Sequence, residues 1–211
     1  MDKYLSIITN FGCHGKCPYC IVRENGIDVP KTTIEGLNNL ISEVNKNKCN
    51  IVSISGGGDP LHNYNQHIDY YAKLIDMLQD NNIRLEMHTS YINSQFPMDK
   101  CHRVVYHLQD IHQLYDIKRQ GNEKVRVVFV ATRRFSTQDF ILIARAVDVL
   151  PDIDELSFRQ LVDNDYKTMY YNHETLKWGH EKGLWHYIEQ NDYNLYYVNG
   201  QIFTEFSKIH R

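Results

Sequence analysis

The sequence predicts an α/β protein built on a parallel β-sheet. Two observations carry this prediction. Short apolar runs alternate with helix-length amphipathic stretches along most of the chain, which is typical of repeated strand–helix units. The 211 residues are 42% hydrophobic and 23% charged, the composition of an ordinary globular domain. A chain of this length buries one full core and leaves little for a second independent domain, so we expect a single domain.

Six runs are expected as strands because they are short, rich in β-branched and aromatic residues, and bounded by turn residues. The link between the third and fourth runs contains Pro97 and is too short for a long helix. The six expected strands are Tyr4–Thr9, Asn50–Ser55, Ile83–His88, Arg103–His107, Val125–Val130 and Glu155–Gln160.

Three of the connections predict helices, since apolar residues recur three and four positions apart and would share one face. Threonine and serine residues precede the first and third helices as candidate caps. The first helix is expected over Thr33–Lys46 behind Thr32 and Thr33, the second carries a stripe of Ile68, Tyr71, Ala72, Ile75 and Leu78, and the third, after Ser136 and Thr137, carries Phe140, Ile143, Ala144, Val147 and Leu150.

The composition changes at Val162 to tyrosine, asparagine and histidine. We expect a helix near Glu174–Gln190 and then a hairpin, because the pair Asn199-Gly200 suits a type I′ turn between two apolar runs. The expected organisation is a core over residues 1–161 and an extension over residues 162–211 that packs on the same domain. Aromatic residues of this extension either cover an open side of the core or pack together in a smaller, separate apolar cluster.

Charge and hydropathy exclude two classes of protein. The formal net charge of -3 offers no basic face for a long nucleic acid. No stretch of about 18 apolar residues is present, and the N-terminal run has no signal-peptide cleavage pattern. We therefore expect a cytoplasmic protein that acts on something other than a long polyanion.

Three of the five cysteines, Cys13, Cys17 and Cys20, crowd into one loop directly after the first strand, with the spacing C-x3-C-x2-C. An odd number of cysteines and this crowding favour a metal site in a reducing compartment over disulfides. Three thiolates on one loop suit three irons of a cubane cluster and leave the fourth iron open. The alternative is a zinc knuckle closed by a histidine such as His14, which lies poorly placed between its would-be partners.

The cysteine motif resembles the signature of the radical S-adenosylmethionine (SAM) superfamily, C-x3-C-x-aromatic-C, and Tyr19 fills the aromatic position. The resemblance implies a partial (β/α)6 barrel with a C-terminal helix and hairpin extension. It also implies a [4Fe-4S] cluster on Cys13, Cys17 and Cys20, SAM on the open iron, and adenine against the backbone of Tyr19. Cys49 and Cys101, which precede the second and fourth expected strands, are then structural thiols.

A second motif, Gly57-Gly58-Asp59-Pro60, closes the second strand and resembles the G-G-E-P motif of the same family, with aspartate in place of glutamate. The resemblance implies that Gly57, Gly58 and Asp59 bind the amino group of SAM. Polar residues at the carboxyl ends of the later strands would face the same cleft. Among these, Thr132 and Arg159 are the preferred further SAM-binding residues, since an arginine in an apolar strand needs an anionic partner.

The function implied by the resemblance is oxidoreductase chemistry. An electron from a flavodoxin- or ferredoxin-like donor drives reductive cleavage of SAM to a 5′-deoxyadenosyl radical, which abstracts hydrogen from a substrate. A small or nucleotide-like substrate is one reading, because the 7-carboxy-7-deazaguanine synthases are comparably small; Ile21, however, stands where those enzymes carry a metal-binding hydroxyl. The alternatives are a glycyl-radical activase acting on a protein, and a non-catalytic iron–sulfur or zinc-binding module.

Overall fold

A single mixed sheet forms the framework of the protein in the computed structural model, which describes residues 2–163, 165–189 and 195–209. Its strands lie in the order β10-β9-β1-β2-β3-β4-β5-β6-β7, and β8 also pairs with β6, at Ser157–Arg159. The strands are β1 (Tyr4–Thr9), β2 (Ile51–Gly56), β3 (Arg84–Thr89), β4 (Arg103–Leu108), β5 (Lys124–Ala131), β6 (Glu155–Val162), β7 (Thr168–Met169), β8 (His186–Ile188), β9 (Leu195–Val198) and β10 (Gln201–Phe203).

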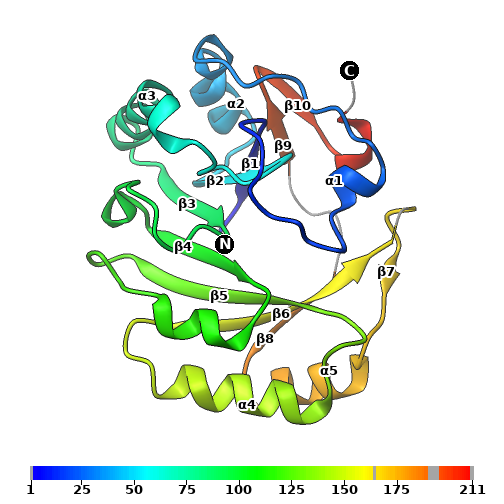
Figure 1. The fold of residues 1–211 in the computed structure, drawn as a ribbon. Helices are drawn as coiled ribbons and strands as arrows, with labels where there is room; N and C mark the ends of the chain where they lie inside the picture. The colour runs from blue at the N-terminus through cyan, green and yellow to red at the C-terminus, as the bar shows by residue number, and fades with distance from the viewer. Residues whose placement is uncertain (1, 164, 190–194, 210–211) are drawn as a thin grey trace.

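The six expected strands are β1 to β6, each found within two residues of its expected ends. Every neighbouring pair from β1 to β6 is parallel. The sheet curls into an open arc with the longer helices along its outer side (Figure 1). The fold is therefore the predicted α/β class, a partial barrel whose sheet does not close.

The first expected helix is shorter than the sequence predicts. Instead of one helix over Thr33–Lys46, a 3-10 turn over Glu35–Leu37 precedes α2 (Leu40–Lys46). The C-terminal hairpin contacts the start of this segment, where Oδ1 of Asn199 accepts from the N–H and the hydroxyl of Thr33 at 3.2 and 3.0 Å. At Gly36 the approach is so close that an added Cβ would stand 2.0 Å from the same oxygen.

The buried face of helix α3 (Ile68–Asp80) agrees in part with the predicted stripe: Tyr71 and Leu78 are buried, and Ile75 is partly buried against the core. Tyr70, Tyr71, Leu74 and Leu78 are buried, whereas Ile68 is 46% exposed and Ala72 is exposed. The rings of Tyr70 and Tyr71 stack edge-on against each other at 5.4 Å, and both also contact the ring of Phe11. The large aromatic side chains decide which face turns inward because they bury the most apolar area.

Helix α4 (Thr137–Asp148) confirms the predicted serine cap and most of the predicted stripe. The Ser136 hydroxyl accepts from the Asp139 backbone N–H at 3.3 Å, and the Asp139 carboxylate accepts in return from the Ser136 N–H at 2.7 Å. This is a complete capping box. Phe140 and Ile143 are buried with the rest of the stripe, except for the partly buried Leu150.

The C-terminal extension contains the predicted hairpin but a shorter helix. Helix α5 spans His173–Glu181, because Gly183 takes a left-handed φ of +71° and the chain turns back to form β8; Gln190, where the helix was expected to end, lies outside the described residues. Asn199 and Gly200 both have positive φ between β9 and β10, as a type I′ turn requires.

Both edges of the sheet are extended by this tail. Strand β8 pairs in parallel with β6, and β9 pairs in parallel with β1. The hydroxyl of Tyr197 donates to the carbonyl of Gly36 at 2.5 Å. The extension therefore belongs to the same sheet as the strands that precede it.

Candidate functional site

The cysteine loop lies at the carboxyl end of β1, where the strand passes into α1 (Ile21–Glu24). All three thiols are free; Cys13 is exposed and Cys17 and Cys20 are half-buried. Burial raises the pKa of the Cys17 thiol, and the neighbouring sulfurs of Cys13 and Cys20 raise this pKa further. A Cβ at Gly15 would lie 3.4 Å from Sγ of Cys13 and 3.6 Å from Sγ of Cys17, so these two sulfurs lie on either side of one loop residue.

The glycine segment after β2 is joined directly to the cysteine loop. The backbone N–H of Gly57 donates to the Thr9 carbonyl at 2.8 Å, and that of Asp59 donates to the Gly12 carbonyl at 3.0 Å. A Cβ at Gly58 would lie 2.1 Å from the same Gly12 oxygen. Only glycine fits at position 58 without moving the loop that carries the cysteines.

Asp59 is buried and its carboxylate is engaged by its own chain. One oxygen accepts from the Leu61 N–H at 3.0 Å and the Thr89 hydroxyl at 2.7 Å. The other accepts from the N–H and the hydroxyl of Ser90, both at 2.7 Å. The Ser90 hydroxyl in turn lies 3.3 Å from Nε2 of His14 in the cysteine loop. Asp59 therefore fixes the end of β3 against the cysteine loop.

Two cavities meet at Tyr19. One, of about 550 Å³, is bordered by Tyr19 and Thr132 together with the turns that follow β4 and β5. The other, of about 430 Å³, lies inside the curve of the sheet and is bordered by Tyr19, Gly56 and Arg159. Burial raises the pKa of the Tyr19 hydroxyl to about 12, so this group stays protonated at neutral pH. The structure thus places Thr132 and Arg159 in different cavities on either side of Tyr19.

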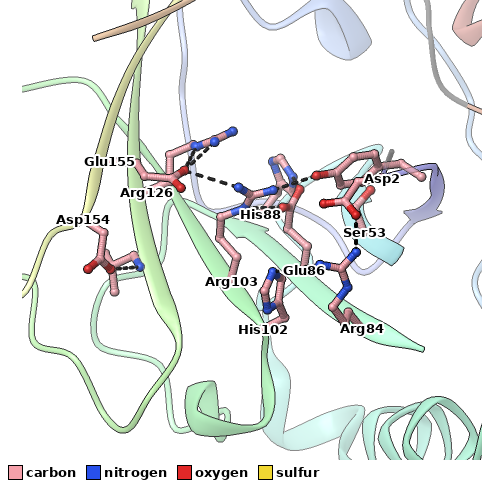
Figure 2. Close-up of polar contacts among 12 residues, drawn as sticks. Asp2, Ser53, Arg84, Glu86, His88, His102, Arg103, Arg126, Asp154 and Glu155 are labelled. Atoms are coloured by element: carbon pink, nitrogen blue, oxygen red, sulfur yellow. Dashed lines mark hydrogen bonds and ion pairs between the residues drawn. The ribbon is translucent and has the colours of Figure 1, made fainter. Parts of the chain in front are cut away.

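The inner cavity has a charged floor, drawn in Figure 2. The Arg103 guanidinium donates to Glu86 at 2.5 Å, to Glu155 at 3.3 Å and to the Tyr4 hydroxyl at 2.7 Å. Glu155 also accepts from Nε of Arg126 at 2.5 Å. Barrel interiors are usually filled by branched apolar side chains, so this continuous chain of ion pairs across β3, β4, β5 and β6 is a marked departure.

Two histidines, His88 and His107, extend this network beyond Glu86. Nε2 of His88 lies 2.8 Å from Glu86, and Nδ1 of His88 lies 3.1 Å from Nε2 of His107. Burial would raise the pKa of Glu86, but the hydrogen bond and charge of His88 and the charge of Arg103 outweigh it and lower this pKa to about 2. Burial, His88 and Arg159 lower the pKa of His107 to about 3. Both nitrogens of His88 are occupied within the protein, which makes it a structural member of the floor.

The residues of this floor lie outside the predicted site, although the strands carry a signal for them. Strands of a parallel sheet are normally apolar on both faces. Glu86 lies between Leu85 and Met87, and Arg126 lies between Val125 and Val127, so each charged residue alternates with apolar ones. Charges at every second position of a parallel strand indicate a polar interior. Of the charged residues within these strands, only Arg159 is predicted as a site residue on this ground.

The residues of the cysteine loop fit a [4Fe-4S] cluster. The donor set consists of three free thiols on one loop, and sulfur is the ligand that such clusters require. Within the described residues, no three His, Cys, Asp or Glu side chains converge closely enough to hold a single metal ion. A cubane distributes its three sulfur ligands over three irons, so it needs no convergence on one point.

The chain thus combines an open parallel α/β barrel with a three-cysteine loop at the carboxyl end of the first strand. This combination defines a class of protein. A sequence comparison with known families matches residues 7–103 to the Radical SAM superfamily. This match supports membership of the chain in the radical SAM superfamily. A comparison with curated proteins gives no significant match.

The remaining cysteines and the tail aromatics occupy two environments. Cys49 and Cys101 are buried, and burial raises the pKa of both thiols. Trp185 and Tyr197 are buried in the main core, whereas Tyr166 and Tyr196 border the inner cavity. Part of the tail therefore lines the cavity, and part packs in the core.

No helix in the described ranges is both long and apolar enough to cross a bilayer.

Proposed function

We propose that this protein is a radical SAM enzyme in which Cys13, Cys17 and Cys20 hold a [4Fe-4S] cluster and the inner cavity holds a small substrate. When bound, the cluster supplies one electron that cleaves SAM to methionine and a 5′-deoxyadenosyl radical, which then takes a hydrogen atom from the substrate. The reaction class follows from the superfamily. The ligand set, substrate and residue roles are our proposals.

The observation that carries the proposal is the joining of the two motifs at one end of the sheet. The hydrogen bonds from Gly57 to Thr9 and from Asp59 to Gly12 hold the glycine segment against the cysteine loop. The cysteine loop itself contributes Tyr19, which borders both cavities. A molecule bound at the thiols would therefore lie beside two open cavities with room for a further ligand.

The proposed roles of the chain's own residues are binding, orientation and exclusion of water. Thr132 and the backbone at Tyr19 would hold the nucleoside part of SAM in the outer cavity. Arg159 would attract the carboxylate of SAM, since a guanidinium pairs well with a carboxylate. Gly57 and Gly58 allow close approach of a ligand to the backbone, and Asp59 keeps the β3 end in position. The apolar rim of the inner cavity would limit entry of water to a radical.

A small substrate is favoured because the inner cavity measures only about 430 Å³. A nucleotide-like or other polar metabolite would match its charged floor. A glycyl-radical activase role on a protein has no observation of its own in its favour, and a non-catalytic iron–sulfur or zinc module is the competing class. The proposed electron donor is flavodoxin- or ferredoxin-like, and the proposed location is the cytoplasm.

Anaerobic purification and reconstitution test the proposal. We expect about four irons and four sulfides per chain and, with dithionite and SAM, formation of 5′-deoxyadenosine measured by chromatography and mass spectrometry. Replacing Cys13, Cys17 or Cys20 by alanine should abolish both, whereas Cys49→Ala and Cys101→Ala are matched controls that should retain both. Zinc in place of iron and sulfide, or no 5′-deoxyadenosine from iron-loaded protein, would contradict the proposal.

A further inference from the structure

Gln109 contacts the cysteine loop from the opposite part of the sheet. It is the first residue after β4, whereas the loop follows β1. Its side-chain Nε2 lies 3.0 Å from Sγ of Cys17, within hydrogen-bonding distance for an amide donor and a sulfur acceptor. Neither the cysteine motif nor the glycine motif includes this residue.

The backbone around Gln109 is fixed by its own hydrogen bonds. The N–H groups of Gln109 and Asp110 both donate to Oε1 of Gln113, at 2.8 and 3.0 Å. The Asp110 carboxylate accepts from the His112 N–H at 2.8 Å, which completes a capping box on the 3-10 helix Ile111–Asp116. Leu108, the last residue of β4, is buried. The Gln109 amide therefore extends toward Cys17 from a rigid turn.

A hydrogen bond to a ligand sulfur changes the redox properties of an iron–sulfur cluster. Reduction adds negative charge, and part of that charge resides on the sulfurs. A donor directed at a sulfur stabilises the reduced form more than the oxidised form, so the reduction potential rises. A charge-neutral amide achieves this without adding a full charge to the site.

We propose that Gln109 is a positioning residue that donates a hydrogen bond to Cys17 and makes the cluster easier to reduce. This inference rests on the proposed function, because it requires the cluster to bind at Cys17. It assigns to Gln109 a role in the electron-transfer step and not in recognition of the substrate. The donor that reduces this protein would then need a less negative potential than it would without Gln109.

Two variants and a control test the inference on the anaerobically reconstituted full-length protein without SAM. Gln109→Leu removes the donor, and Gln109→Glu keeps the shape but replaces the donor with an acceptor that carries negative charge. Gln138→Leu makes the same substitution at an exposed position on α4. The midpoint potential is measured by a redox titration followed by electron paramagnetic resonance, and circular dichroism checks the fold.

One neutral hydrogen bond changes an equilibrium constant by about 2- to 10-fold. We therefore expect the ratio of reduced to oxidised cluster at a fixed solution potential to fall by about that factor in Gln109→Leu, and further in Gln109→Glu. A tenfold fall corresponds to a potential lowered by about 59 mV for one electron. Gln138→Leu should match the wild type.

Equal midpoint potentials in the wild type and both Gln109 variants, at equal iron content, would overturn the inference. Folded variants that fail to take up the cluster would also overturn it, since Gln109 would then serve assembly. Failure of the wild type to bind iron and sulfide would instead refute the proposed function. An active wild type with an unchanged potential in Gln109→Leu would refute only the role of Gln109.

Discussion

Gly58→Ala is the substitution whose effect on the cysteine loop can be worked out most directly. The added methyl carbon would lie 2.1 Å from the Gly12 carbonyl oxygen and 3.3 Å from Cβ of Cys13. Even a close carbon–oxygen contact requires about 3.3 Å, so the two loops must separate by roughly 1 Å. The Asp59 N–H to Gly12 hydrogen bond, now 3.0 Å, would then be lost.

The magnitude follows from these two changes. Overpacking at a close contact costs about 1–3 kcal/mol, and the lost hydrogen bond about 1 kcal/mol more. Because the strained contact is with the residue before Cys13, the displacement falls on a proposed cluster ligand. We expect Gly58→Ala to bind less than about half of the wild-type iron after reconstitution, as a loop displaced by roughly 1 Å loses its preorganised geometry.

The assay is iron and sulfide analysis of reconstituted protein, together with urea denaturation. Gly183→Ala is the control, because Gly183 has a left-handed φ of +71° and open space around it. That variant should be destabilised by about 1–2 kcal/mol through backbone strain alone and should keep its iron. Full iron content in Gly58→Ala, or equal loss in Gly183→Ala, would show that the contact with Gly12 does not control cluster binding.

Three further outcomes concern stability and are measured by urea denaturation. Glu86→Gln breaks a buried ion pair with Arg103 and should lower the free energy of unfolding by about 3–5 kcal/mol; a change below 1 kcal/mol would mean that the pair is screened. Acid should destabilise the protein in two stages. Because the folded pKa of His107 is about 3 against an ordinary 6.5, its contribution is complete above pH 6.5 and is lost as the pH falls toward 3. Glu86, with a folded pKa of about 2 against 4.5, loses a contribution of roughly 3 kcal/mol between pH 4.5 and 2; His107→Gln should flatten the first stage only, and an unchanged profile would contradict this assignment. Ser136→Ala removes the α4 cap and should cost about 1 kcal/mol, with no effect on iron content.

Local signals in the sequence were sufficient for most of the framework. The strands β1 to β6, the Ser136 cap and the Asn199-Gly200 turn follow from short apolar runs bounded by turn residues, capping chemistry and positive φ, each of which depends on a few neighbouring residues. The position of the cysteine loop and of the glycine segment at strand ends follows from the same strands. These features needed no knowledge of distant contacts.

Features set by distant contacts were not predictable in this way. The rings of Tyr70 and Tyr71 on α3 contact Phe11, which is far from them in the chain. Asn199 contacts the segment before α2, and Gln109 lies beside Cys17 because the loops after β1 and β4 meet in the folded chain. The SAM-binding roles of Thr132 and Arg159 stay predictions, and the structure adds that the two residues border different cavities.

The pairing of β9 with β1 has a consequence for solubility. Strand β9 covers the outer edge of the strand that leads into the cysteine loop, and the free edge passes to β10, which has only three residues. A short edge offers few unpaired backbone groups to a second molecule. A chain cut before Leu195 would expose the edge of β1 that pairs with β9, at Leu5, Ser6 and Ile7. Such a protein should self-associate through the strand that leads into the cysteine loop, so loss of the tail would appear first as aggregation.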